Sequence, residues 1–219
     1  MTPVQTSQSK LALGDPDGES TIAFYNARAA AYADQTAHVD LSEVYDRFLA
    51  LAPAGPILDA GSGGGRDTLA FLKRGREVDA FDASEELARI STERTGVTTQ
   101  VVRFETFQTT KRYAGIWACA SLLHVTQFEL SDAIGRLANA LATNGVFFMS
   151  FKYGDEQRME PDGRRFTDLN EVSLSMHIHR QPRLRFNSMW VFDGASTAGK
   201  TSWLNAMAVR KHRLSRRRS

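Results

Sequence analysis

The chain has 219 residues, of which 42% are hydrophobic and 24% charged, and these values predict one soluble domain with a full hydrophobic core. Its single cysteine, Cys119, excludes an internal disulfide and favours a reducing, cytoplasmic location. No apolar run approaches the roughly 20 residues of a membrane span. The N-terminal segment also lacks the apolar core of a signal peptide, so we expect no membrane partner.

The formal net charge of +2 is distributed unevenly along the chain. Six of the last ten residues, Arg210–Ser219, are lysine or arginine, which leaves 2 − 6 = −4 for the rest. Such a block is usually a solvated tail, but it could also bind RNA or an acidic partner. We expect a flexible segment over residues 1–19, a single domain over 20–210 and a basic tail over 211–219.

Two helices are expected before the first strand. Ser20 is a candidate N-cap for a helix over Thr21–Asp34. Apolar residues on one face predict a second helix over Leu41–Ala52, which Pro53 and Pro56 end.

The segment Ile57–Asp67, ILDAGSGGGRD, reads as a strand, a glycine turn and the start of a helix. Glycine lets the backbone approach a ligand closely, and a helix start offers unpaired N–H groups to an anionic group. The dinucleotide fingerprint G-x-G-x-x-G, counted from Gly61, would need a small residue where Arg66 stands. The spacing that fits is an acidic residue, Asp59, followed by alternating glycines.

Strands and helices alternate after this turn, which predicts a parallel sheet with helices on both faces. Ser84 is the expected N-cap of the helix that follows the second strand. The expected strands are Glu77–Phe81, Thr98–Phe104, Gly115–Ala120 and Val146–Phe151, and the expected helices cover Asp67–Arg74, Ser84–Arg94 and Glu129–Ala142.

The last third of the chain has a different pattern. A charged loop over Lys152–Arg165 leads to an expected helix over Asp168–Met176. Two further strands, Leu184–Phe192 and Ser202–Arg210, are expected to form an antiparallel hairpin at the end of the sheet.

The segment Gly194–Thr201, GASTAGKT, matches the phosphate-binding pattern G-x-x-x-x-G-K-[ST]. A phosphate-binding loop of this kind needs a following helix and a further acidic strand. Only 18 residues follow Thr201, so we interpret the segment as the turn of the hairpin.

The residues Asp59, Gly61, Gly63 and Gly65 resemble motif I of the class I S-adenosylmethionine (SAM) methyltransferases. Further segments resemble a small bacterial subgroup of that family, related to the tellurite-resistance methyltransferases. These are AFYNARAAAYADQT at Ala23–Thr36, AGIWACASLLHV at Ala114–Val125, NGVFFMSFKYG at Asn144–Gly154, DGRRFTD at Asp162–Asp168 and WLNAMAVR at Trp203–Arg210.

The resemblance implies the fold of that family, which is α/β. It is a Rossmann-like, seven-stranded, mostly parallel sheet with a C-terminal antiparallel hairpin. The domain over residues 20–210 would then be a methyltransferase domain, with residues 20–52 as N-terminal lid helices.

The resemblance also implies SAM as cofactor and assigns residues to it. Asp82 would accept the ribose hydroxyls, Asp59 would hold the amino group and Arg66 could meet the carboxylate. The glycine backbone at Gly61, Gly63 and Gly65 would receive the methionine end. The adenine would lie against Thr106, Phe107 and Gln108, the sulfonium and ribose against Ala118, Cys119 and Ala120, and the lid would carry Tyr25 and Tyr32.

His124 is the candidate catalytic residue, because an imidazole can take a proton from the acceptor. Lys152, Tyr153, Arg164 and Arg165 could shape the acceptor side, where an arginine pair would favour an anionic acceptor. A merely solvated loop is the alternative.

We therefore predict an enzyme that transfers the SAM methyl group to a small-molecule acceptor. Two alternatives stay open: a SAM-binding module without catalysis, and an RNA methyltransferase that uses the basic tail. His177 and His179 lie two residues apart but lack further ligands at metal spacing, so we expect no metal site.

Overall fold

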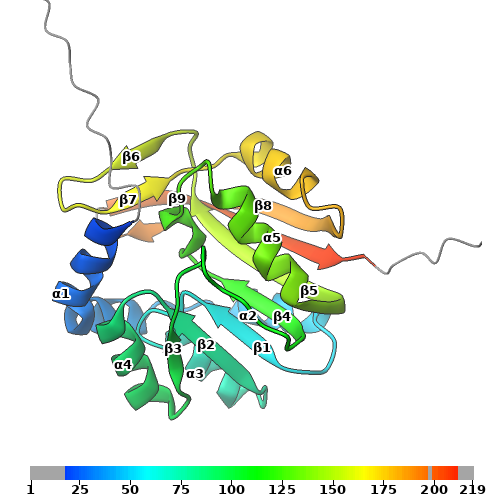
Figure 1. Ribbon diagram of the computed structural model, residues 1–219, viewed down its shortest axis with the longest axis horizontal. Coiled ribbons are helices and arrows are strands. Elements are labelled where there is room, and N and C mark those ends of the chain that lie inside the picture. Colours follow the sequence, from blue (N-terminus) through cyan, green and yellow to red (C-terminus); the bar gives the residue numbers. More distant parts are fainter. Residues whose placement is uncertain (1–17, 197–198, 212–219) are drawn as a thin grey trace, which may run out of the picture.

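The computed structural model describes residues 18–196 and 199–211. In this part of the chain, a seven-stranded sheet has the order β3-β2-β1-β4-β5-β9-β8 (Figure 1). Strands β1 to β5 run parallel, whereas β9 is antiparallel to both β5 and β8. The expected α/β fold with a C-terminal hairpin is confirmed. The strands are β1 Ile57–Ala60, β2 Val78–Asp82, β3 Thr99–Val101, β4 Tyr113–Ala118, β5 Leu141–Lys152, β8 Leu184–Ser196 and β9 Gly199–Arg210.

Helices cover both faces of the sheet (Figure 1). They are α1 Glu19–Ala37, α2 Ser42–Leu51, α3 Arg66–Lys73, α4 Glu85–Thr95, α5 Leu130–Ala140 and α6 Glu171–His179, with a 3₁₀ turn η1 over Leu122–His124. Successive strand residues point to opposite faces. Ile116 therefore packs in one core with residues of α5 and α6, and Trp117 packs in the other with residues of α2 and α3.

The N-caps of two helices were predicted from single serines, one correctly and one wrongly. Ser84 caps α4 as expected, since its hydroxyl accepts from the Leu87 N–H at 3.2 Å. The expectation for Ser20 is wrong: α1 begins two residues earlier than expected, at Glu19, with Gly18 as its N-cap. The Ser20 hydroxyl instead donates to the carbonyl of Gly163 at 2.8 Å, which ties α1 to the segment before β7.

The segment Lys152–Arg165, expected as a loop, contains most of a small hairpin. Strands β6 (Gln157–Met159) and β7 (Arg165–Thr167) pair antiparallel and form a separate two-stranded sheet. In Figure 1 this hairpin lies beside the start of α1. The helix expected over Asp168–Met176 is α6, which begins at Glu171 and extends to His179, so that His177 and His179 both lie on it.

The Gly194–Thr201 segment lies in the β8–β9 hairpin, with Ser196 paired to Gly199. Strand β9 follows in place of the helix that a phosphate-binding loop requires. Residues 197–198, most of the expected flexible segment 1–19 and all but Lys211 of the expected tail 211–219 lie outside the described residues. Within the described part, no helix has the length and apolarity to span a membrane.

Candidate functional site

A cavity opens at the carboxyl ends of β1, β2 and β4, where ligands of parallel α/β sheets bind. It includes about 1000 Å³ of space free of protein atoms, part of it open to solvent. The loops after these strands and the helix α1 line it. Of the expected site residues, it brings together Tyr25, Tyr32, Gly61, Gly63, Arg66, Asp82, Cys119, Ala120 and His124, whereas Asp59, Gly65, Thr106, Phe107 and Ala118 are not at its surface.

The glycine turn after β1 lies flat against its neighbours. A Cβ on Gly61 would lie 2.4 Å from Cβ of Ser121, and Gly61 has a φ of +76°. The N–H groups of Gly61 and Ser62 both donate to the carbonyl of Phe81, at 2.9 and 3.0 Å. The turn is therefore fixed to β2, and its backbone forms the floor of the cavity.

Asp82, the last residue of β2, lies at the centre of the cavity wall. Its two carboxylate oxygens accept from the N–H groups of Gly63 at 2.8 Å and Ser84 at 2.9 Å. Burial raises the pKa of this carboxyl, and the backbone hydrogen bonds oppose that rise. A carboxylate has about four lone-pair sites, so it can still accept from the two hydroxyls of a ribose.

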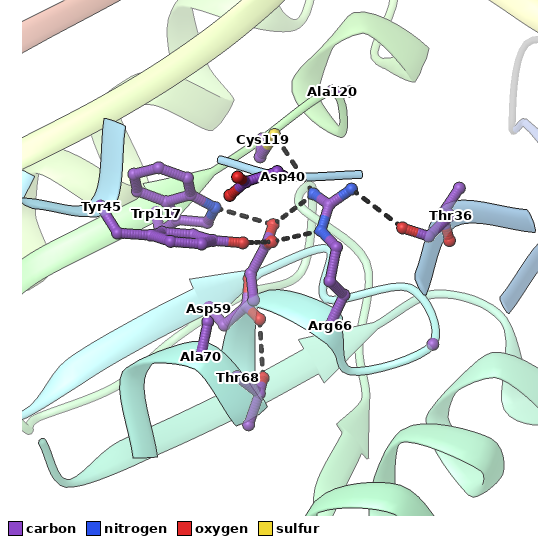
Figure 2. A network of polar contacts seen from close by, with 12 residues as sticks. Thr36, Asp40, Tyr45, Asp59, Arg66, Thr68, Ala70, Trp117, Cys119 and Ala120 are labelled. Atoms are coloured by element: carbon purple, nitrogen blue, oxygen red, sulfur yellow. Dashed lines mark hydrogen bonds and ion pairs between the residues drawn. The ribbon is translucent and has the colours of Figure 1, made fainter. Parts of the chain in front are cut away.

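Arg66 reaches the cavity from the first turn of α3, and Asp67 holds it there (Figure 2). The guanidinium donates from Nε to Oδ1 at 2.6 Å and from Nη2 to Oδ2 at 2.9 Å of that carboxylate. Asp67 also accepts from the Tyr45 hydroxyl and from Nε1 of Trp117 at 2.8 Å, as Figure 2 shows. Burial alone would raise the pKa of Asp67, but Arg66 and the neutral donors lower it below its ordinary value.

Asp59 does not face the cavity, although we expected it to hold a ligand's amino group. It is 1% exposed, and its carboxylate accepts from the Thr68 hydroxyl at 2.6 Å, beneath the glycine turn (Figure 2). Burial, together with the charge of Asp67, raises the pKa of Asp59 to about 8. Its position supports a structural role under the turn.

The residues after β3 that line the cavity differ from those we expected. Thr106 is exposed, and Phe107 is buried against Phe81, with ring centroids 4.9 Å apart. Val102, Phe104 and Glu105 line the cavity in their place. The reason is that β3 ends at Val101, so the chain turns into the cavity earlier than expected.

At the end of β4, Cys119 and Ala120 line the cavity and Ala118 lies in the core. The Ala120 N–H donates to the Ser150 hydroxyl at 2.8 Å, which joins this loop to β5. Burial raises the pKa of the Cys119 thiol to about 12. Cys119 therefore stays protonated and is a poor nucleophile.

Tyr25 and Tyr32 of α1 cover one side of the cavity, with ring centroids 5.0 Å apart. The Tyr25 hydroxyl lies 2.8 Å from Nε2 of His124, and Nδ1 of His124 lies 2.6 Å from the carbonyl of Arg165. A carbonyl only accepts, so Nδ1 carries the proton and Nε2 accepts from Tyr25. Burial lowers the pKa of His124 to about 4, so the ring is neutral.

The sequence analysis did not single out Ser62, which lies between the motif glycines. Ser62 lines the cavity and is 8% exposed, and its buried hydroxyl has no hydrogen-bond partner among the described residues. Its place inside the glycine motif was the signal that could have identified it. In the described ranges, no group of three His, Cys, Asp or Glu side chains has a metal-binding arrangement.

Comparisons with known proteins agree with this geometry. Residues 57–145 match a family model described as a methyltransferase domain. A relative from Staphylococcus carnosus, described as an uncharacterized methyltransferase, is 27% identical over 162 residues, which span 71% of this chain and 75% of that protein.

Solved structures share the fold. A 1,6-didemethyltoxoflavin-N1-methyltransferase from Burkholderia thailandensis, solved with its substrate and S-adenosylhomocysteine (SAH), has a TM-score of 0.73 at 18% identity and covers 96% of this chain and 99% of its own. A magnesium protoporphyrin IX methyltransferase from Synechocystis PCC 6803 with bound SAH has a TM-score of 0.70 at 16% identity, covering 89% and 100%. The family model and the relative are both described as methyltransferases, and the solved structures show the shared fold.

Proposed function

We propose that this protein is a SAM-dependent methyltransferase whose acceptor is a small molecule. The main support for the proposal is the hydrogen bond between the Asp82 carboxylate and the glycine turn. The Asp82 carboxylate is fixed by the Gly63 N–H, so a ribose acceptor and a turn open to close approach lie side by side in one cavity.

Two features of the cavity fit the proposed cofactor. A Cβ at Gly61 would clash with Ser121, so glycine there lets the turn pack closely against the loop after β4 and form the floor of the cavity. The buried Ser62 hydroxyl, without a partner among the described residues, is a polar group of the kind that a polar ligand satisfies.

Each part of SAM has a proposed neighbour in the cavity. Asp82 would hold the ribose, and Phe104 with Val102 would contact the adenine. Arg66 would meet the methionine carboxylate, since its Nη1 lies beside the cavity and makes only a 3.5 Å contact with the carbonyl of Thr36. Cys119 and Ala120 would lie beside the sulfonium.

When bound, SAM supplies an electrophilic methyl group: a lone pair of the acceptor forms the new bond while the C–S bond breaks and its electron pair stays on sulfur. The chain's own residues orient the reactants and exclude water. Tyr25 and Tyr32, on the lid that α1 forms over the cavity, would exclude water.

We propose that His124 assists the methyl transfer by positioning Tyr25 and does not act as the base. A ring with a pKa of about 4 is a weak base near neutral pH. We infer that Nε2 orients the Tyr25 hydroxyl next to the reacting atoms, while the bond from Nδ1 to the Arg165 carbonyl fixes the ring.

A small acceptor is supported by the cover over the cavity, because α1 limits the space for a macromolecule. The RNA alternative depends on the basic tail, most of which lies outside the described residues.

Calorimetry with SAM and SAH tests the proposal. Wild-type protein is expected to bind both, and Asp82→Asn to bind at least about tenfold more weakly, since an amide nitrogen would face a backbone N–H. Asp132→Asn, an exposed change on α5, is the matched control. Unchanged affinity in Asp82→Asn, or no binding by wild type, would overturn the assignment.

A further inference from the structure

A group of cations packs on two aromatic rings next to Tyr25 and His124, outside the residues that line the cavity. Phe24 precedes Tyr25 on α1, and their ring centroids are 5.3 Å apart. The ring of Phe166, on β7, lies 4.9 Å from the His124 ring. Four cationic groups lie on these two rings. Lys152, Arg158 and Arg164 are 3.7, 4.9 and 5.3 Å from the centroid of Phe166. Arg164 and Arg28 are 4.4 and 5.1 Å from the centroid of Phe24.

Two of these cations have carboxylate partners. Arg158 pairs with Glu160 at 2.5 Å and with Asp168 at 2.9 Å. Arg164 pairs with Asp162 at 2.8 Å. These pairs engage the carboxylates of Glu160, Asp162 and Asp168.

The Lys152 ammonium makes no ion pair or hydrogen bond with another described residue, although the side chain is half-buried at the end of β5. Its ammonium lies on the face of Phe166, which compensates part of its lost hydration. Burial and the charge of Arg158 lower the pKa of Lys152, and the carboxylates of Asp168 and Glu160 offset only part of that shift.

Arg165 is a second cation without a counter-ion in the described part of the chain. It is 4% exposed, yet its guanidinium meets no carboxylate or hydrogen-bond acceptor there. Nη1 lies 4.0 Å from the position of a Cβ on Gly18, which lines the cavity. A buried cation without a partner costs free energy, and a ligand of opposite charge would offset that cost.

These charges act at the reacting end of the cavity. The Lys152 ammonium is no further from the His124 ring centroid than the sum of 3.7 and 4.9 Å, because both distances end at the Phe166 ring. Arg164, Lys152 and Arg165 all act electrostatically on His124 and lower its pKa. A local excess of positive charge attracts ligands of negative charge.

We propose that the methyl acceptor is a small organic anion, with a carboxylate or phosphate group drawn to the Tyr25–His124 end of the cavity by Lys152, Arg164 and Arg165. The inference rests on the proposed function. Where the anionic oxygen is itself the attacking atom, transfer of the methyl group cancels its negative charge and the positive charge of the sulfonium.

Binding to the SAH complex tests the acceptor class directly. Calorimetry first establishes that the wild-type protein binds SAH; failure there contradicts the proposed function. The complex is then titrated with 4-hydroxybenzoate, phenyl phosphate and the neutral 4-hydroxybenzamide. We expect at least one of the two anions to bind and the amide to bind at least about tenfold more weakly.

Substitutions of Lys152 test whether this cation contributes to anion binding. Lys152→Met is expected to weaken anion binding at least about tenfold and leave SAH affinity unchanged, whereas Lys152→Arg restores most of it. Lys73→Met, an exposed change in the last turn of α3, is the control. The proposal is wrong if SAH binds but neither anion does, if the amide binds as well as the anions, or if Lys152→Met has no effect.

Discussion

The guanidinium of Arg66 and the carboxylate of Asp67 meet through two parallel contacts, at 2.6 and 2.9 Å, although the two residues are adjacent in the chain. Tyr45 and Trp117 complete the hydrogen bonding of the same carboxylate from α2 and β4 (Figure 2). Three elements therefore fix the direction of Arg66, and we infer that they present it to the methionine end of the cofactor.

Replacing Arg66 by lysine tests that role. Lysine keeps the charge beside Asp67 but lacks the fork that can bind both Asp67 and a second carboxylate. We expect SAH to bind at least about tenfold more weakly to Arg66→Lys, while 5′-methylthioadenosine, which lacks the amino-acid part, binds as it does to wild type. Equal losses for the two ligands would indicate general damage to the cavity and contradict the assigned contact.

Replacing Gly61 by alanine tests the role of the glycine turn, and the same change at Gly75 is the control. Gly61 and Gly75 have nearly the same φ, +76° and +74°, but a Cβ meets Ser121 at 2.4 Å in the first case and nothing within 4 Å in the second. Alanine at either position should cost roughly 1 kcal/mol or more of stability through backbone strain. Gly61→Ala alone should abolish SAH binding in calorimetry. Normal SAH affinity in Gly61→Ala would show that the turn does not form the cofactor floor.

Asp59 predicts a pH dependence of stability. Its pKa is about 8 in the folded protein and about 3.9 in an unfolded chain. The folded state therefore holds a proton that the unfolded state has lost, and stability falls as pH rises from about 4 to about 8. His124, with its lowered pKa, has the opposite effect between about 4 and 6.5.

Denaturation at pH 6.5 and 8 separates the two contributions, since His124 is neutral in both states over most of this range. The unfolding free energy of wild type is expected to fall by about 1 to 2 kcal/mol over this interval because of Asp59. Asp59→Asn keeps an oxygen for Thr68 and should lose this slope. Parallel pH curves for the two proteins would contradict the assigned protonation of Asp59.

His124 should remain neutral in the folded protein at pH 6, with the proton on Nδ1. Nitrogen NMR distinguishes this tautomer from the other one and from the imidazolium, and His124→Asn identifies the signal. Unfolding in urea should return the residue to a titration near pH 6.5. A folded-state imidazolium at pH 6, or a proton on Nε2, would remove the basis for the Tyr25–His124 hydrogen bond.

Parts of this structure were predictable because single residues determined them. The short segment before the glycine turn identifies β1, whose four residues are all buried, and Ser84 identifies the start of α4. The spacing from Asp59 to Gly65 and the place of Asp82 at the end of β2 located the cavity. Each of these signals is local, so no knowledge of distant contacts was needed.

The features that were missed depend on contacts between distant segments. Strands β6 and β7 are three residues each, with charged residues among them, so their pattern resembles a loop. The burial of Asp59 follows from Thr68, which lies on the next helix and covers it. Ser20 looks like a cap in sequence, but Gly163, 143 positions away, takes its hydroxyl.

A crystal structure of the protein with SAH would test the central claim most directly. The account predicts both ribose hydroxyls within hydrogen-bond distance of the Asp82 carboxylate, with the ligand lying over Gly61–Gly64 and its sulfur beside Cys119 and Ala120. SAH bound elsewhere, or bound in this cavity without contact to Asp82, would contradict it.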